Sequence, residues 1–227
     1  MKKTVIFGNN VIAEMIHRET IQYGSDLEIV AFTVDEAYRK VDSFCGLPMV
    51  DFKKALSLYP PSDFYMLSSL DSMSILRGRM NIFEKIKSAG YAMPNYISKL
   101  SDTPKDTIMG ENNIILAFAH IGVHGKMGNY NTIRQNTYLG HGFEISDGTI
   151  ITAGNSIGGC CRIGNLCYFG LGAVTLHSKT IADETLIGAG AVVTKDTDPY
   201  TKYVGNPARP IGTHEDTGII FKVKSKN

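Results

Sequence analysis

Residues 115–193 read ILAFAH IGVHGK MGNYNT IRQNTY LGHGFE ISDGTI ITAGNS IGGCCR IGNLCY FGLGAV TLHSKT IADETL IGAGAV V, and every group except the one at Thr175 begins with an apolar residue. A six-residue period fits neither an α-helix, which repeats near 3.6 residues, nor a simple alternating strand. Sustained over this length, it predicts a solenoid in which three short strand-and-turn segments close one coil of about eighteen residues. The first residue of each group should point into a triangular prism.

Two further slots of the repeat agree with a tightly turned coil. Glycine follows the apolar residue at positions 122, 128, 140, 158, 164, 170 and 188, where we expect the corners to need unusual backbone angles. Two residues before the apolar position, most side chains are small, as at Ala119, Cys161 and Ala191. Both slots indicate sharp corners with little room for side chains.

The repeat, together with the closing segment VGNPAR at 204–209, resembles the hexapeptide-repeat acyltransferases. That resemblance implies an all-β domain folded as a left-handed parallel β-helix, and the handedness follows from the resemblance alone. It also implies that the NPAR turn closes the base of the prism.

Length and composition favour two domains and a short tail. A chain of 227 residues with 43% hydrophobic content can hold two modest cores, and the repeat occupies only its second half. We expect domains at 1–97 and 98–211 and a C-terminal tail at 212–227. The net charge of +1 provides no field for nucleic acid or an anionic membrane. The only basic cluster, Lys222, Lys224 and Lys226, is interpreted as a solvated end.

Cysteine usage and the N-terminus both favour the cytoplasm. Cys45, Cys160, Cys161 and Cys167 form no CxxC pair, so we expect small buried thiols in a reducing compartment and no metal site. The apolar run at 5–7 is too short for a secretory signal or a membrane span.

The first half alternates strands with helices. Residues 4–8, 28–32 and 63–67 have strand composition, the stretches from 11 and at 75–89 have helical spacing, and 91–97 leads out. This pattern predicts a small parallel sheet with helices on its faces, an α/β N-terminal domain. Ligands of such sheets bind at the carboxyl ends of the strands, where Gly8, Asn9, Asn10 and Asp35 should gather. The dinucleotide fingerprint GxGxxG is incomplete, because Asn10 and Ala13 replace two glycines.

A βα front half followed by hexapeptide coils resembles the sialic-acid O-acetyltransferase and nucleotide-sugar N-acetyltransferase group. The resemblance implies a Rossmann-like front domain that holds the nucleotide of a UDP-, dTDP- or GDP-linked sugar. It further implies acetyl-CoA as co-substrate, transfer of the acetyl group to the sugar amine, a homotrimer that binds coenzyme A between subunits, and a place in surface-glycan (lipopolysaccharide) synthesis.

Acyl transfer to an amine needs a base for the amine proton and donors for the oxyanion. Histidine is the usual base near neutral pH, and by resemblance His141 in the sequence Leu-Gly-His is that base. Gly159 follows eighteen residues later, one coil along and about 4.8 Å away, and its N–H is the candidate oxyanion donor. His177 and Lys195 continue the same column.

Cofactor-binding residues are carried over from the family. By resemblance, Leu171 and Ala189 flank the pantetheine and adenine of coenzyme A, alongside Gly159. Lys195, near the end of the prism, is a candidate partner for a coenzyme A phosphate or an exposed lysine without a ligand.

The chain departs from the family pattern at two positions. Relatives commonly follow the base with an acid that orients it, whereas Gly142 follows His141, and Ile150 stands where a second histidine is found. Glu144 and Asp147 are the nearest acids in sequence that could substitute.

Three alternatives remain open at this point. One is a zinc hydratase like the γ-class carbonic anhydrases, with His120, His124 and His141 as ligands. Another is a nucleotide-sugar-binding protein that has lost catalysis. The third is acylation of a hydroxyl group, which depends more on the base than N-acylation does.

Overall fold

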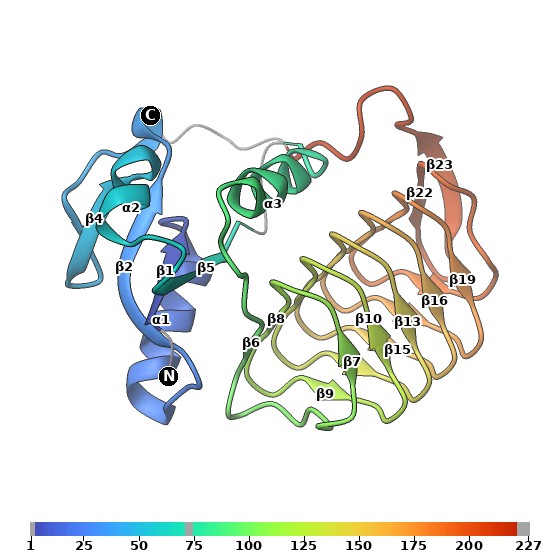
Figure 1. The fold of residues 1–227 in the computed structure, drawn as a ribbon. Coiled ribbons are helices and arrows are strands. Elements are labelled where there is room, and N and C mark those ends of the chain that lie inside the picture. Colours follow the sequence, from blue (N-terminus) through green and yellow to red (C-terminus); the bar gives the residue numbers. More distant parts are fainter. Residues whose placement is uncertain (1–2, 71–74, 222–227) are drawn as a thin grey trace.

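The computed structural model describes residues 3–70 and 75–221 and divides into two parts (Figure 1). An α/β sheet with its helices lies at one end, and a prism of stacked coils runs away from it. The tail lysines Lys222, Lys224 and Lys226 lie outside the described residues. None of the helices in the described ranges is both long and apolar enough to span a bilayer.

The N-terminal sheet has the strand order β3-β4-β2-β1-β5. Its strands are β1 (Lys3–Phe7), β2 (Glu28–Val34), β3 (Ser43–Phe44), β4 (Leu47–Asp51) and β5 (Phe64–Ser68). The pairs β1–β2, β1–β5 and β2–β4 are parallel, whereas β3 pairs antiparallel with β4. The three strands expected from the sequence are therefore present, and β3 and β4 are additional.

Two of the three α-helices described in this part begin at a capping side chain. α1 (Val11–Tyr23) begins after Asn10, whose side chain accepts a hydrogen bond from Ala13 N–H. α2 (Phe52–Leu58) begins after Asp51, which caps Lys54 N–H in the same way. α3 (Gly78–Ser88) lies within the expected helical stretch, and η1 (Glu36–Tyr38) is a single 3₁₀ turn after β2.

Both faces of the N-terminal sheet pack against the first coils of the prism. On one face, Ile6 and Phe32 share a core with Tyr96 and Ile114. On the other face, Val5 and Phe7 share a core with α3 and with Tyr130. The two parts are thus joined by continuous apolar packing.

A buried arginine adds polar contacts to this junction. Arg79 of α3 is fully buried, and its guanidinium lies 4.5 Å from the ring centre of Tyr130. It donates hydrogen bonds to the carbonyl oxygens of Leu70 (2.8 Å), Gly148 (2.7 Å) and Tyr130 (3.0 Å). A buried charge is costly unless it is hydrogen-bonded, so this arrangement specifies one orientation of α3 on the coils.

The coils form three sheets, one for each face of the prism (Figure 1). Sheet I contains β6 (Tyr96–Ile97), β8 (Ile114–Ile115), β11 (Thr132–Ile133), β14 (Ile150–Ile151), β17 (Tyr168–Phe169), β20 (Leu186–Ile187), β22 (Thr201–Val204) and β23 (Arg209–Thr213). Sheet II contains β9 (His120–Ile121), β12 (Tyr138–Leu139), β15 (Ser156–Ile157), β18 (Val174–Thr175) and β21 (Val192–Val193). Sheet III contains β7 (Ile108–Met109), β10 (Lys126–Met127), β13 (Glu144–Ile145), β16 (Arg162–Ile163) and β19 (Thr180–Ile181).

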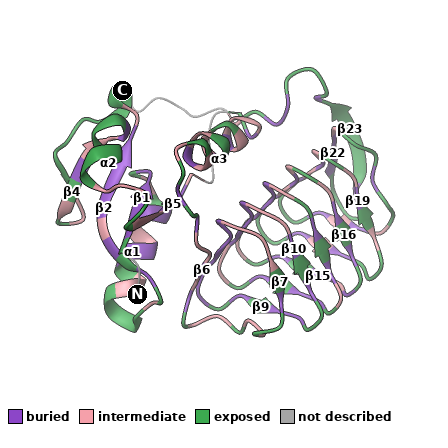
Figure 2. Ribbon diagram, in the orientation of Figure 1, coloured by how far each residue is buried: buried purple, intermediate pink, exposed green. Residues whose placement is uncertain are grey.

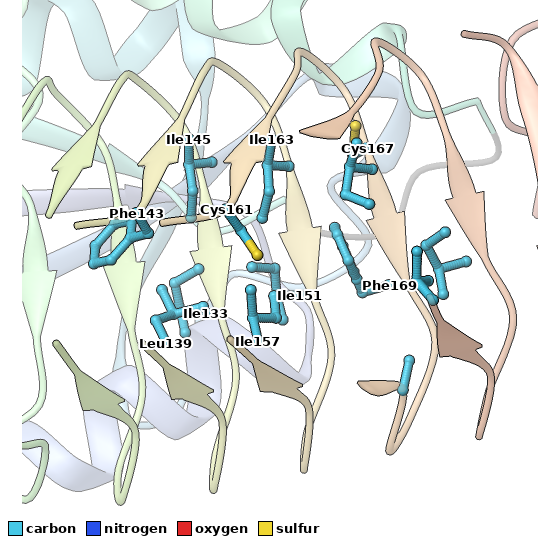
Figure 3. Packing of buried hydrophobic residues seen from close by; sticks show 14 of the residues in the cluster. Ile133, Leu139, Phe143, Ile145, Ile151, Ile157, Cys161, Ile163, Cys167 and Phe169 are labelled. Carbon is cyan, nitrogen blue, oxygen red and sulfur yellow. The ribbon is translucent and has the colours of Figure 1, made fainter. Parts of the chain in front are cut away.

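The second residue of each coil strand from β8 to β21 is the periodic residue of the sequence, and all of these side chains are buried in the prism (Figure 3). Even Thr175 is only 2% exposed. Burial of one apolar side chain of this size stabilises the fold by about 1.5–3 kcal/mol, so the column compensates for strands of only two residues. The mostly small residues two positions before each periodic residue line the same core. The large Phe143 occupies one of these positions, where it fits because Gly125 lies beside it.

The predicted reason for the corner glycines is wrong. Gly122 and Gly140 do not adopt a positive φ; instead, a Cβ atom on Gly140 would lie 2.3 Å from the backbone nitrogen of Gly159 in the next coil. These glycines therefore permit close approach between coils. The left-handed backbone occurs two residues later, at every sixth residue from Asn112 (φ 54°) to Gly190 (φ 66°).

The three faces of the prism present different surfaces (Figure 2). Sheet I is covered from β8 to β14, where Ile114, Thr132 and Ile150 are buried, and Ile150 packs against Leu76 and Ile219. Sheet III carries a charged ladder in which Glu144 lies 3.6 Å from Lys126 and 3.5 Å from Arg162. Sheet II is exposed and not charged in this way, with Tyr138, Ser156 and half-buried Val174 on its surface.

Candidate active site

The site centres on the corner between sheets II and III. Parallel pairing of β12 with β15 and of β15 with β18 aligns the turns that follow them. This register stacks His141, Gly159, His177 and Lys195 in one column, as the eighteen-residue spacing predicts. The column borders the exposed face of sheet II.

The His141 ring lies directly over Gly159. A Cβ atom on Gly159 would lie 2.7 Å from Cε1 of His141, 2.9 Å from Nδ1 and 3.0 Å from Nε2. Any side chain at this position would therefore displace the imidazole. Within the described residues, Gly159 N–H donates to no other group, and its carbonyl accepts a hydrogen bond from Ser178 N–H at 2.9 Å. An exposed imidazole thus lies beside a free backbone donor.

Neither of the acids near His141 in sequence contacts it. The Glu144 carboxylate belongs to the ladder of sheet III, beside Lys126 and Arg162. Asp147 accepts a hydrogen bond from Asn129 N–H at 2.7 Å, at the corner between sheets III and I. In the described part of this chain no carboxylate is hydrogen-bonded to His141.

The two positions that depart from the family pattern have separate structural settings. Gly142 adopts φ 63° in the series of left-handed turn residues, and Glu184 tolerates the same conformation at φ 50°. Ile150 is buried on sheet I beneath Leu76 and Ile219, so this position packs the junction.

Leu171 and Ala189 do not lie beside His141 in the chain. They follow β17 and β20, and therefore occupy the corner between sheets I and II. Both are exposed. Sheet II separates this corner from the His141 column, so a single chain carries the two predicted groups at opposite edges of one face.

Lys195 lines a pocket at the far end of the prism. The pocket has a volume of about 350 Å³ and includes Arg209, Asp196 and Tyr203. Two cationic side chains in one concave surface suit a phosphate, although two acids, Asp196 and Asp198, line it as well.

A second pocket, of about 240 Å³, lies at the carboxyl ends of β1 and β2. Asn9, Asp35 and Tyr38 line it, with apolar walls from Phe7, Val34 and Ile82. Asp35 is ion-paired with Lys85. Two of the four residues predicted to bind substrate are therefore brought together here.

The other two predicted substrate-binding residues have structural roles. Gly8 has φ 134°, and a Cβ atom there would lie 2.2 Å from the Ser69 hydroxyl oxygen. The Asn10 side chain caps α1 and also donates to the carbonyl oxygen of Ser69 at 3.0 Å. They shape the strand-to-helix turn beside the pocket.

The remaining histidines do not gather into a zinc site within the described chain. His120 Nδ1 lies 2.7 Å from an Asp102 carboxylate oxygen, and its ring stacks on Tyr138 at 5.2 Å. His124 is an exposed turn residue with φ 61°. His214 is 5% exposed, its Nε2 lies 2.7 Å from the Glu184 carbonyl oxygen, and burial lowers its pKa. The His120–Asp102 pair escaped sequence reasoning, although eighteen residues separate its members.

The expectation that all four cysteines are buried is wrong for Cys160. Cys161 and Cys167 are buried in the prism, Cys45 is half-buried and Cys160 is exposed. Cys160 occupies the left-handed turn slot, with φ 57°. Its thiol lies beside His141 and His177.

Comparison with known proteins finds acetyltransferases among the proteins that this chain resembles. No protein-family model matches the chain. A putative acetyltransferase of Schizosaccharomyces pombe is 37% identical over 86 residues, 35% of this chain and 42% of its own length. The chain therefore matches less than half the length of this curated relative.

Solved structures match this chain along almost its whole length. The acetyltransferase domain of PglB from Neisseria gonorrhoeae superposes with a TM-score of 0.82 at 23% identity, covering 93% of this chain and 100% of that domain. PerB from Caulobacter crescentus, solved with CoA and GDP-perosamine, superposes with a TM-score of 0.80 at 20% identity, covering 93% and 98%. The short parallel strands thus fit the left-handed β-helix acetyltransferase fold.

Proposed function

We propose that this chain, which has the fold of the hexapeptide-repeat acetyltransferases, transfers an acetyl group from acetyl-CoA to the amine of a nucleotide-linked amino-deoxysugar. The observation that carries the proposal is the His141 ring lying over Gly159 on an exposed corner. PerB, which shares the fold, was solved with CoA and a nucleotide-linked sugar. We assign the reaction to surface-glycan synthesis in the cytoplasm, where the free thiols of this chain would stay reduced.

The proposed chemistry uses few groups. The neutral sugar amine attacks the thioester carbonyl carbon while a His141 ring nitrogen accepts the amine proton. Gly159 N–H stabilises the oxyanion that forms. The carbonyl is restored as the C–S bond breaks, and coenzyme A leaves as a thiol with the proton that His141 accepted. Because no carboxylate of the described residues is hydrogen-bonded to His141, we assign the orientation of the ring to substrate contacts.

The nucleotide is assigned to the pocket of Asn9 and Asp35. The Asp35 carboxylate suits a sugar hydroxyl or a base N–H, and the start of α1 offers N–H groups to a pyrophosphate. Gly8 and Asn10 act by shaping the turn. This front half is assigned as a Rossmann-like nucleotide-sugar domain, and its parallel sheet supports that assignment.

The placement of the cofactor residues supports the homotrimer that we propose. If Leu171 and Ala189 flank coenzyme A while its acetyl group reaches His141, the two corners must come from different copies. Exposed apolar side chains surround sheet II, as a covered face requires: Phe118, Val123, Tyr138, Leu171 and Leu176. Lys195 would then meet a phosphate of coenzyme A beside Arg209.

The competing functions differ in measurable ways. A sugar O-acetyltransferase would acylate a hydroxyl, and an inactive paralogue would bind nucleotide sugar without turnover. The absence of a carboxylate partner for His141 in the described chain favours N-acylation over O-acylation, because a hydroxyl depends more on its base.

The test is release of free thiol from acetyl-CoA with UDP-, dTDP- and GDP-linked 3-amino and 4-amino sugars, using wild type and His141→Asn. Turnover with one aminosugar, lowered about 100-fold or more in the variant, is expected. Unchanged turnover in the variant would remove His141 as the base. Sugar binding by calorimetry without turnover, lost in Asp35→Ala, would instead favour the binding protein.

A further inference from the structure

Three side chains able to bind a metal ion converge at the corner between sheets II and III. They are His141, Cys160 and His177, and one ligand atom from each lies within 4.8 Å of the other two. All three are exposed, so an ion from solvent can reach them. Within residues 3–70 and 75–221, this is the one group of histidine, cysteine and acidic residues with such geometry.

Gly159 allows the two histidines to approach. His141 and His177 are two coils apart, which separates their backbones by about 9.6 Å at the usual strand spacing. Their ring centres are nevertheless only 5.9 Å apart. The residue between them has no side chain, and the His141 ring occupies the space that a Cβ atom would fill.

The Cys160 thiol lies within van der Waals reach of Gly142. A Cβ atom on Gly142 would lie 3.4 Å from Sγ of Cys160, so the thiol extends over Gly142 toward the coil of His141. The Cys160 backbone is held there, because its N–H donates to the His141 carbonyl oxygen at 2.7 Å. Three successive coils therefore present nitrogen, sulfur and nitrogen to one point.

We propose that His141, Cys160 and His177 bind one divalent ion of the Zn²⁺ class and that this ion inhibits the chain. Two imidazoles and one thiolate suit a borderline-soft ion, and three protein ligands leave a fourth position for water. Tetrahedral zinc with Zn–S of about 2.3 Å and Zn–N of about 2.1 Å needs ligand atoms about 3.5 Å apart, which rotation of exposed side chains provides. The cysteine proton is released to solvent on binding.

Inhibition follows from the ligand atoms themselves. An imidazole nitrogen that donates its lone pair to the ion cannot accept a proton from an amine. This consequence rests on the proposed function, whereas metal binding itself does not. The ion and acetyl-CoA would also compete for the same corner.

The test titrates the full-length protein with Co²⁺ and follows the sulfur-to-cobalt charge-transfer band, with Zn²⁺ equilibrium dialysis for stoichiometry. We expect one ion per chain and a band that is lost in Cys160→Ser. His177→Gln should weaken metal binding at least about tenfold, because loss of a residue that only hydrogen-bonds to a metal ligand already costs that much. Cys45→Ser and His120→Gln are matched controls for the other accessible thiol and for an exposed histidine that pairs with Asp102, and both should bind as wild type does.

Two results would overturn the proposal: no charge-transfer band in wild type, or a band that survives Cys160→Ser. In the activity arm, Zn²⁺ should inhibit wild type but not Cys160→Ser, which keeps the proposed base and oxyanion donor. If the chain fails to transfer acetyl groups, the cobalt measurement still decides the metal site.

Discussion

The two corners that border sheet II share one repeating backbone and carry different side chains. The corner toward sheet III presents His141, Gly159 and His177, whereas the corner toward sheet I presents Leu171 and Ala189. The inward residues hold the coil in both cases, so the corner slots are free to vary. We call the corner with His141, Gly159 and His177 the reactive edge and the corner with Leu171 and Ala189 the smooth edge. Both edges border sheet II, so each chain carries two different halves of the proposed site.

The largest effect is expected from placing a methyl group on the reactive edge. Gly159→Ala puts a Cβ atom 2.7 Å from the His141 ring, and its nearest contacts are all atoms of that ring. Turnover should fall about 100-fold, because the base is displaced, while the melting temperature changes little. The same substitution in a His141→Asn background should cause no further loss. A full additional loss there would show that Gly159 acts independently of His141.

A large side chain on the smooth edge should weaken the use of acetyl-CoA and leave that of the nucleotide sugar unchanged. Ala189→Arg is expected to raise KM for acetyl-CoA about tenfold through steric block of the pantetheine arm, with KM for the nucleotide sugar unchanged. Steady-state kinetics with each substrate varied in turn provides the measurement. Equal increases in both KM values would contradict the assignment of this edge to coenzyme A.

A charge on the surface of sheet II should lower the mass of the assembly about threefold, from three chains to one. Val174→Glu places a carboxylate on the outer surface of sheet II, and light scattering should then give the mass of one 24.8 kDa chain in place of three. Thr180→Glu makes the same charge change on sheet III and should leave the trimer intact. If only the Thr180→Glu variant dissociated, the interface would lie on sheet III and not on sheet II.

The smallest effect is expected far from both edges. Burial lowers the pKa of His214, so the unfolded chain binds this proton more readily than the folded one. Its neutral form therefore supports stability above the ordinary histidine pKa of about 6.5, and that support is lost as pH falls below this value. His214→Gln should make unfolding by urea less pH-dependent between about pH 6.5 and 5. An identical pH slope in wild type and variant would contradict this account.

The repeat could be predicted almost residue by residue, because one inward side chain every six residues is a local and redundant signal. The strands β1, β2 and β5 were also predictable from their apolar runs. β3, β4 and the short helix α2 were missed. Residues 43–51 are short and mixed in composition, and the pairing of β4 with β2 depends on tertiary context. Arg79 could not be recognised as buried, because its partners are backbone carbonyls of distant coils.

Part of the candidate site could likewise be predicted from the sequence, and part could not. The alignment of His141 with Gly159 follows from the eighteen-residue register, which the sequence contains. The exposure of Cys160 does not follow, because it depends on which turn slot is left-handed, and the glycines at 122 and 140 suggested the wrong slot. The separation of Leu171 from His141 likewise required knowledge of which corner each residue occupies.

The central claim is that one site is built from the reactive edge of one copy and the smooth edge of another. Two impaired variants, His141→Asn and Ala189→Arg, should be unfolded, refolded together in equal amounts and assayed at acetyl-CoA well below KM. Random assembly joins two intact edges in one of four pairings, so activity should recover to about a quarter of wild type. Activity no higher than the mean of the two variants refolded separately would contradict a site shared between copies.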